Sequence, residues 1–358
     1  MTLRETLLRT IRSRNPGGVL GWFWWDGEAA KYHSEDDLRR TANALPAPLL
    51  WHGLQLPPRE RLNAKLERDA WGCVWQNEID GLVGQVVGNP LASYDRLAHY
   101  RPPLHLLDVH QDEMVRIRSE IQQVPDSLHR IGWLQLYERM RYLRPAQELY
   151  LDIADDAPEV YRLRDVVMAY LHRELDVYVS LGIDVVTFSE DWGTQTSLQI
   201  APTAWKRIFK PAYKELFDRV HKAGGMVEFH SCGFIRDIID DLIELGVEVV
   251  HSQVGCMDLP ELSRRFKGRI CFEADFDRQQ MPQQSPEWVR SEVFRIVEQL
   301  GSPAGGLFIV AEVAGATPLE NVEAYIAAIR ELSPATPCQQ SPACDVATHV
   351  RWRMGSGY

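Results

Sequence analysis

From residue 131 onward, short apolar runs alternate with longer amphipathic segments. The apolar runs are continuous, which is typical of parallel β-strands covered on both faces. The segments between them repeat apolar residues at helical spacing and predict α-helices. The predicted strands are 131–136, 183–188, 226–229, 247–251, 269–272 and 306–310.

The predicted helices carry their own boundary signals. Pro202, Pro286 and Pro318 stand where a first helical turn tolerates proline. Ser285 and Thr317 precede two of these prolines as candidate N-caps. Glycines close several of the preceding helices. The predicted helices are 158–181, 202–223, 236–245, 259–266, 286–300 and 318–332.

The first 130 residues are less regular. A first helix is followed by an aromatic strand at 20–25 and by a helix at 34–44. Residues 70–90 alternate in polarity about Asp80-Gly81, which predicts a β-hairpin with that pair at its turn. Residues 93–128 predict interrupted helix.

Sustained alternation of strand and helix predicts an α/β fold with a parallel sheet. Six regular strands, the aromatic strand and room for one more favour a closed (β/α)8 TIM barrel. We expect a single domain over 1–332, with decorations and first strands in 1–130 and regular βα units in 131–332. In residues 333–358 proline recurs among polar residues without any periodicity, which predicts a flexible tail. We expect its two cysteines, Cys338 and Cys344, to have no functional role.

The composition of the chain limits the classes of molecule that it can bind. The chain has 358 residues, 45% of them hydrophobic, and a formal charge of -11, which argues against a nucleic-acid backbone or an anionic membrane as the main partner. Small molecules and proteins remain as partner classes. Six irregularly spaced cysteines do not predict a disulfide framework, so we expect reduced thiols and a cytoplasmic protein. No apolar run is long enough for a transmembrane helix.

In barrels of this type the chemistry lies at the carboxyl ends of the strands. Carboxylates, imidazoles and one thiol stand at these ends, so we expect them to converge on one mouth. Each taken alone could instead be a salt-bridged structural residue. These strand-end residues are Asp26, Glu138, Arg139, Glu190, Asp191, Trp192, His230, Cys232, His251, Gln253, Glu273, Asp275 and Glu312.

His230 and Cys232 form the most specific pair among them. Residues i and i+2 of a strand share a face, so both side chains can point at one spot beyond the strand's end. Catalytic zinc takes nitrogen and sulfur ligands, which makes His-x-Cys a usable half-site. The alternative is a buried histidine beside an inert buried cysteine.

The aromatic strand Leu-Gly-Trp-Phe-Trp-Trp at 20–25 has two interpretations. Trp22 and Trp24 could floor a pocket for a flat ligand. The alternative is that the aromatic cluster belongs to the core.

Several motifs resemble one enzyme superfamily in order and spacing. They are Ser-Glu-Asp-Trp-Gly-Thr-Gln at 189–195, His-Ser-Cys-Gly at 230–233 and Thr-Pro-Leu-Glu-Asn-Val at 317–322. Together they resemble the uroporphyrinogen decarboxylase superfamily over roughly residues 1 to 332, most strongly from about 131 onward.

The resemblance implies one of two activities. One arm of the superfamily is a metal-free decarboxylase that acts on a tetrapyrrole. The other contains zinc-dependent methyltransferases and demethylases that move methyl groups between a corrinoid and a thiol or a methylated donor. Their metal is held by His-x-Cys and a later cysteine. His230 and Cys232 match that pattern, while Glu312 is the nearest candidate where the later cysteine is expected.

Two departures from the family pattern affect the substrate. The arginine-rich signature of the decarboxylase is replaced by Trp-Trp-Asp-Gly-Glu at 24–28, which leaves little to bind a poly-carboxylate. Glu273 and Asp275 stand where relatives usually have a glycine-rich strand end. These two carboxylates imply either a substrate or a set of metal ligands that differs from that of the relatives. The alternative is that they form structural ion pairs.

We therefore expect zinc-dependent methyl transfer or demethylation, with a corrinoid as substrate or as the cofactor of a separate partner protein. Zn²⁺ would be held by His230, Cys232 and Glu312 or a nearby carboxylate. A small-molecule substrate and a possible homodimer complete the expected partners. The expected catalytic residues are Asp191, Glu190, Asp26 and His251, and the expected substrate contacts are Trp22, Trp24, Trp192, Gln253, Glu273 and Asp275.

Two alternatives stay open. The first is a metal-independent decarboxylase on a smaller acid, using Asp191, Asp26 and His251. The second is a non-catalytic barrel that binds a tetrapyrrole or a partner protein.

Overall fold

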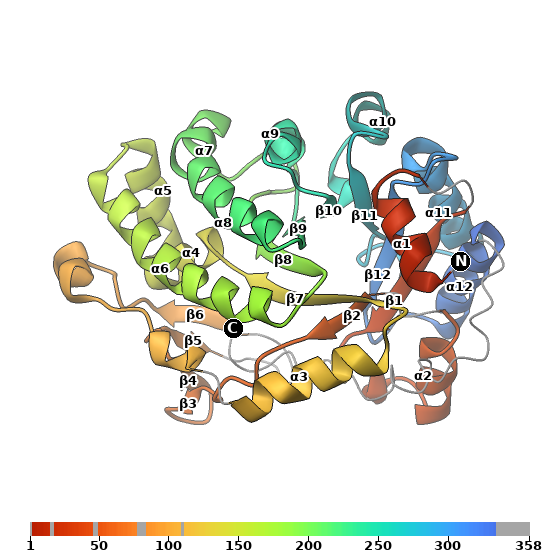
Figure 1. Ribbon diagram of the computed structural model, residues 1–358. Helices are drawn as coiled ribbons and strands as arrows, with labels where there is room; N and C mark the ends of the chain where they lie inside the picture. The colour runs from red at the N-terminus through yellow and green to blue at the C-terminus, as the bar shows by residue number, and fades with distance from the viewer. Residues whose placement is uncertain (1, 15–17, 46–48, 77–83, 109–110, 334–358) are drawn as a thin grey trace.

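Eight parallel strands curl into one sheet, with helices packed around its outside (Figure 1). The computed structural model describes residues 2–14, 18–45, 49–76, 84–108 and 111–333. The strands pair in the order β1-β12-β11-β10-β9-β8-β7-β2. Their bounds are β1 Leu20–Trp25, β2 Leu49–His52, β7 Leu128–Leu134, β8 Val185–Glu190, β9 Met226–Ser231, β10 Val249–Ser252, β11 Cys271–Asp275 and β12 Leu307–Val313.

The predicted TIM-barrel class and all six regular strands are confirmed. The barrel is not fully joined by backbone hydrogen bonds, however. Among the described residues, β1 pairs with β12 and β2 pairs with β7, but no pairing joins β1 to β2. The ring of strands therefore has one seam, between β1 and β2.

Twelve α-helices lie in the described residues, and the longest, α6, has 23 residues. None of the described helices is both long and apolar enough to cross a membrane. The helices are α1 Leu3–Ile11, α2 Glu35–Ala42, α3 Gln111–Gln123, α4 Tyr137–Leu143, α5 Ala146–Ala154, α6 Pro158–Ser180, α7 Pro202–Ile208, α8 Lys210–Lys222, α9 Ile239–Glu244, α10 Leu259–Phe266, α11 Pro286–Leu300 and α12 Leu319–Leu332.

The helix boundaries test the capping signals. Helices α10 and α11 have the predicted bounds, and the Ser285 hydroxyl accepts a hydrogen bond from the Trp288 backbone N–H as an N-cap. The N-cap assigned to Thr317 is wrong: α12 begins at Leu319, so Pro318 takes the cap position. The predicted helix 202–223 is interrupted at Phe209, which separates α7 from α8.

A small antiparallel sheet is inserted between β2 and β7. Its strands are β3 Glu60–Arg61, β4 Leu66–Arg68, β5 Val74–Gln76 and β6 Gln85–Gly88. The pairing of β5 with β6 confirms the predicted hairpin. The predicted Asp80-Gly81 turn and the tail from residue 334 lie outside the described residues.

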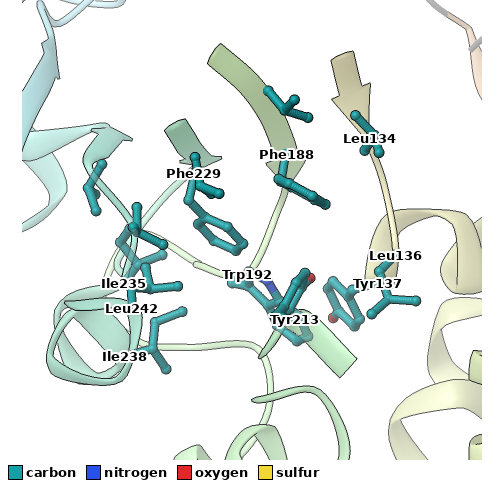
Figure 2. Close-up of a cluster of buried hydrophobic side chains, with 14 of the residues drawn as sticks. Leu134, Leu136, Tyr137, Phe188, Trp192, Tyr213, Phe229, Ile235, Ile238 and Leu242 are labelled. Carbon is teal, nitrogen blue, oxygen red and sulfur yellow. The ribbon is translucent and has the colours of Figure 1, made fainter. Parts of the chain in front are cut away.

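Two apolar layers flank the strands. The larger layer lies between the sheet and the surrounding helices, and it includes Phe188 of β8 and Phe229 of β9 (Figure 2). The Phe229 ring centroid lies 5.3 Å from that of Tyr213 on α8. The smaller layer fills the barrel interior at the amino ends of the strands, where Leu7 and Ile11 of α1 close it. The interior above this layer is polar, and it holds the candidate site.

Candidate active site and metal centre

A buried arginine spans the barrel interior. Arg130 of β7 places Nη1 2.9 Å from Glu228 Oε2 on β9 and 3.2 Å from Glu273 Oε2 on β11. Because three strands separate β7 from β11, this contact must cross the interior. The Arg130 guanidinium also lies 4.1 Å from the ring centroid of Trp51 on β2, an arrangement that favours the cation. The charges at this depth are therefore paired, as burial requires.

His230, His251 and Asp275 lie one layer nearer to the mouth, defined here as the space at the carboxyl ends of the strands. His251 Nε2 lies 2.7 Å from Asp275 Oδ1, and the His230 and His251 rings are 4.3 Å apart between centroids. Each of the three residues offers a ligand atom, and these atoms lie within 4.8 Å of one another. The predicted convergence of these side chains is thus observed.

The sulfur of Cys232 lies beside this group. Cys232 Sγ is 3.5 Å from His230 Nε2. In a tetrahedral zinc site with Zn–N and Zn–S bonds of usual length, a nitrogen and a sulfur ligand stand about 3.5 Å apart. The pair therefore already has the spacing of two ligands on one metal.

Electrostatics keep His230 neutral. Burial and the neighbouring charge of His251 lower the pKa of His230 to about 3. Its Nδ1 atom is buried and has no hydrogen-bond partner among the described residues. A neutral imidazole suits a metal ligand, and the nitrogen that faces Cys232 is Nε2 rather than the unpartnered Nδ1.

His251 and Asp275 form an ion pair. Burial lowers the His251 pKa, but the carboxylates of Asp275 and Glu273 outweigh burial and raise it to about 9. Burial raises the pKa of Asp275, but the His251 charge outweighs it, and the net direction is down. Asp275 is therefore a carboxylate near neutral pH.

Cys232 is protonated in the absence of a metal. Burial, together with the charges of Asp191 and Asp275, raises the pKa of its thiol to about 12. Thiolate is the form that binds zinc, and metal binding displaces the thiol proton. The donor set of imidazole, thiol and carboxylate fits zinc chemistry.

Glu312 has a different partner. Its Oε2 lies 2.5 Å from Arg278 Nη1 at the mouth. Neither Glu312 nor Cys232 belongs to the groups of possible ligands found in the described residues, whereas Asp275 does, together with His230 and His251. Asp275 therefore belongs to the same group of possible ligands as His230, whereas Glu312, the carboxylate predicted from the sequence, does not.

A second group, Glu228, His251 and Glu273, also has ligand atoms within 4.8 Å of one another. Here the Arg130 guanidinium already pairs with both glutamates. The position of a cation in this deeper layer is therefore taken by a side chain, and the contacts of Glu273 are structural ion pairs.

Glu190 has a positioning role that differs from the predicted proton handling. It is buried at the end of β8, where its carboxylate accepts hydrogen bonds from the backbone N–H groups of Leu136, Tyr137 and Glu138 and from the Tyr213 hydroxyl. These donors include the first turn of α4, so Glu190 caps that helix. Burial raises the pKa of Glu190 to about 8, although the hydrogen bonds that its carboxyl group accepts act to lower that pKa.

Trp192 is a core residue, which corrects its predicted contact with substrate. Its side chain is fully buried and stacks on Tyr137 with ring centroids 3.8 Å apart. Figure 2 shows it among the apolar side chains between sheet and helices. A fully buried indole has no surface left for a ligand.

Asp191 and Gln253 lie at the mouth with distinct contacts. The Asp191 side chain is 41% exposed and 3.6 Å from Arg141 Nη1. Gln253 Oε1 accepts a hydrogen bond from the Gly233 N–H, which holds the turn after Cys232. Asp191 can therefore meet a ligand, while Gln253 supports the thiol.

Two glycines fix that turn. A Cβ at Gly193 would lie 2.2 Å from Phe234 N, and one at Gly233, whose φ is +73°, would lie 2.3 Å from Gly193 O. The loops after β8 and β9 thus pack backbone against backbone. The glycines in the Asp-Trp-Gly and His-Ser-Cys-Gly motifs have this physical reason.

The aromatic strand divides between core and mouth. Trp22 is buried in the lower interior layer with its ring 5.4 Å from Phe308. Trp24, two residues further along β1, is only half-buried. Asp26 follows, and its Oδ1 accepts the Glu28 N–H in a turn. Trp22 is thus a core residue, which corrects its predicted substrate contact, while Trp24 stays a candidate.

Sequence reasoning missed Trp133. It sits at a bulge in β7 with φ +78°, a conformation that is strained for a bulky residue. Its indole stacks on His230 with centroids 5.5 Å apart and meets Trp51 edge-on at 5.4 Å. The preceding Gly132, a glycine inside an apolar run, is a signal for a bulge.

Comparisons with known proteins agree with this architecture. A family model described as uroporphyrinogen decarboxylase (URO-D) matches residues 139–332, which is more than half of the chain. A search of curated proteins found no match.

Solved structures give the fold. A methyltransferase from Methanosarcina mazei has a TM-score of 0.67 and 16% identity, covering 92% of this chain and 99% of its own. A D-psicose 3-epimerase from Clostridium cellulolyticum H10 has a TM-score of 0.43 and 9% identity, covering 88% of this chain and 99% of its own. The first likeness shows a shared barrel fold; the second is too weak to bear on function.

Proposed function

Because this chain belongs to the uroporphyrinogen decarboxylase family, we propose that it is an enzyme that transfers or removes a methyl group with the help of zinc at the barrel mouth. The observation that carries the proposal is the pair His230 and Cys232, whose Nε2 and Sγ atoms lie 3.5 Å apart. A metal-free decarboxylase does not need this pair of soft donors.

The zinc would be held by His230, Cys232 and Asp275. Asp275 replaces Glu312 as the proposed third ligand because its carboxylate lies in one group with His230 and His251, while Arg278 pairs with Glu312; Cys232 is outside that group and contacts it through His230. When bound, zinc would act as a Lewis acid and favour thiolate over thiol.

The other residues of the site would bind and orient. His251 holds Asp275 through the 2.7 Å hydrogen bond, as partners of metal-bound carboxylates commonly do. Asp191 is the exposed carboxylate that can orient a polar substrate or accept a proton. Trp24 and Trp133 offer apolar surface to a methylated or planar partner.

The methyl acceptor or donor would be a corrinoid, free or on a separate protein. This part of the proposal rests on the family and on the M. mazei methyltransferase as one structural neighbour. The homodimer and the cytoplasmic location expected from the sequence stay predictions.

The test combines metal content with turnover. Purified protein should hold about one zinc per chain, and it should change the visible spectrum of methylcobalamin in the presence of a thiol. His230→Ala and Cys232→Ala should lose both properties, while Cys256→Ala, a half-buried thiol in the loop after β10, should keep them. Absence of stoichiometric zinc together with unchanged turnover in His230→Ala would refute the proposal.

The same protein separates the alternatives. The charged His251 beside Asp275 is compatible with metal-free decarboxylation, because a cation can stabilise the carbanion left by loss of CO2 and donate a proton to it. Decarboxylation of a small acid that survives chelator treatment would favour that activity. Cobalamin or porphyrin binding without any turnover would favour a non-catalytic barrel.

A further inference from the structure

His230 has no second hydrogen bond that would orient its ring as a metal ligand. In zinc sites the ring nitrogen away from the metal usually donates to a carboxylate, a carbonyl group or water, and this bond fixes the orientation of the imidazole. The Nδ1 atom of His230 is buried without a hydrogen-bond partner among the described residues, while Nε2 lies 3.5 Å from Cys232 Sγ. Within that part of the chain, packing is what remains to orient the ring.

Two aromatic side chains pack against the His230 imidazole. The Trp133 indole stacks on it, with ring centroids 5.5 Å apart and an angle of 23° between the planes. The His251 ring meets it at 63°, with centroids 4.3 Å apart. A turn of the imidazole about its Cβ–Cγ bond would break the stack, so the indole restricts the ring to the plane in which Nε2 lies beside Cys232 Sγ.

A bulge in β7 brings this indole into the barrel. Arg130 points into the interior, so in unbroken alternation the side chain of Trp133 would lie on the outer face of the sheet. The register of β7 shifts just before Leu134, which pairs with Phe188 and takes the outer place in the apolar layer (Figure 2). The extra residue thus turns the indole inward, where it meets His230.

The bulge places backbone strain on Trp133. Its φ is +78°, a left-handed conformation that is unfavourable for a bulky residue. Strained backbone of this kind persists only where the surrounding structure holds it, and it clusters at functional sites. A glycine would relieve the strain but would leave no ring against His230. The strained residue and the contact with the proposed zinc ligand therefore coincide.

The indole is in turn held by its neighbours. Trp51 of β2 meets Trp133 edge-on, with ring centroids 5.4 Å apart. The guanidinium of Arg130 lies 4.1 Å from the Trp51 ring centroid and is itself fixed by its ion pairs in the interior. A row of packed side chains thus connects the deep ion pairs to the proposed ligand at the mouth.

We propose that Trp133 is a positioning residue, which holds the His230 imidazole in the plane that lets Nε2 and Cys232 Sγ bind one zinc ion. This inference rests on the proposed function, because it concerns the ligands of the zinc in that function. Trp133 acts on the metal through His230, so the metal site itself reports its effect.

The test compares variants of the full chain that keep a left-handed residue at position 133. Trp133→Leu keeps apolar bulk without a ring, and Trp133→Phe keeps a ring that can stack. Zinc affinity, measured by competition with a chromogenic chelator, should fall about tenfold or more in Trp133→Leu, as is typical when a residue that orients a metal ligand is lost. Trp133→Phe should lose less.

Trp71→Leu is the matched control. It removes another buried indole, which packs on Tyr170 of α6 with ring centroids 4.8 Å apart, and it should keep the zinc affinity of the wild type. Circular dichroism establishes that each variant is folded. Trp133→Gly, which lacks the ring and carries no left-handed strain, replaces Trp133→Leu in the comparison if the leucine variant does not fold.

Cobalt(II) in place of zinc gives a readout that lower stability alone does not change. At saturating cobalt, the visible d–d bands report the coordination geometry of the filled site, whatever its affinity. Trp133→Leu should change these bands, because the imidazole is free to leave its plane. Trp133→Phe should restore the wild-type spectrum, and Trp71→Leu should not differ from it.

His230→Ala separates this inference from the proposed function. If His230→Ala loses the zinc of the wild type while Trp133→Leu keeps both the affinity and the cobalt spectrum, the positioning role is wrong and the proposed function stands. If the wild type binds no zinc, or His230→Ala binds it equally well, the proposed function is wrong and the positioning role is overturned with it.

Discussion

His251 and Asp275, on the neighbouring strands β10 and β11, are joined by a 2.7 Å hydrogen bond between Nε2 and Oδ1. The bond fixes the carboxylate beside His230 and makes His251 cationic. One side chain thus serves as the partner of a charged imidazole and as the proposed metal ligand.

Asp275→Asn should lower the pKa of His251 in metal-free protein. Asp275 is the strongest of the carboxylates that raise this pKa to about 9, so the variant should move it toward 6.5 by at least about one unit. The imidazole Hε1 resonance followed by NMR against pH reports the change. Asp277→Asn, whose carboxylate accepts from the Gln279 N–H, is the control that should leave it in place.

The same pair has a pH signature in stability. Because the folded pKa of His251 is above its unfolded value, its contribution is fully present below about pH 6.5 and is lost as pH rises through about 9. Urea unfolding of metal-free protein should show a smaller loss over this window in Asp275→Asn. An identical slope in the two proteins would contradict the ion pair.

Asp275→Asn should also weaken zinc binding more than Glu312→Gln does. Loss of one ligand or its support typically costs about 10- to 100-fold in affinity, while Glu312 is engaged by Arg278. Competition with a chromogenic chelator measures both variants. A larger loss in Glu312→Gln would restore Glu312 as the third ligand.

Glu190→Ala should destabilise the fold by about 2 kcal/mol or more, because it leaves the Leu136, Tyr137 and Glu138 N–H groups without their acceptor. Glu190→Gln keeps one side-chain oxygen for these donors and should cost less. Urea denaturation gives both values. Equal stability of Glu190→Ala and wild type would mean that the carboxylate does not hold α4.

Trp133 allows a test of backbone strain. At φ +78°, alanine retains the left-handed penalty and glycine does not, so Trp133→Gly should be more stable than Trp133→Ala by about 1 kcal/mol. At an ordinary strand position the alanine variant would be the more stable of the two. Denaturant midpoints of the two variants decide it, and Trp133→Phe, which keeps a ring against His230, shows how much stacking adds.

The paired imidazoles of His52 and His129 predict sensitivity to acid. His52 Nε2 lies 2.9 Å from His129 Nδ1, and burial lowers the pKa of both residues. Their contribution is therefore present above about pH 6.5 and is lost as pH falls through the lower folded values. His52→Gln should flatten this acid slope in thermal unfolding. His172→Gln, at the partly exposed His172–Glu215 pair, should not.

The strand pattern was enough to predict the barrel and to place His230, Cys232, His251 and Asp275 at one mouth. Continuous apolar runs fix where strands end, and the period of two fixes which side chains share a face. Those two rules need no knowledge of tertiary contacts.

Other features depend on contacts that a linear pattern does not contain. Glu190 caps α4, a helix that the sequence pattern did not predict, so its donors were not visible. Trp192 follows a strand end like Asp191, but stacking on Tyr137 turns it into the core. Arg130 follows His129 and precedes the predicted strand 131–136, so the apolar pattern did not place it in the barrel interior.

The seam between β1 and β2 gives the barrel a mechanical property. A ring of strands closed by backbone hydrogen bonds all round must break bonds in order to widen. In the described residues no backbone ladder joins β1 to β2, so widening at the seam would leave the ladders β1–β12 and β2–β7 intact. We therefore expect the mouth to widen most easily at the strands that carry Trp24 and Trp51, across the ring from the strands that carry the proposed ligands.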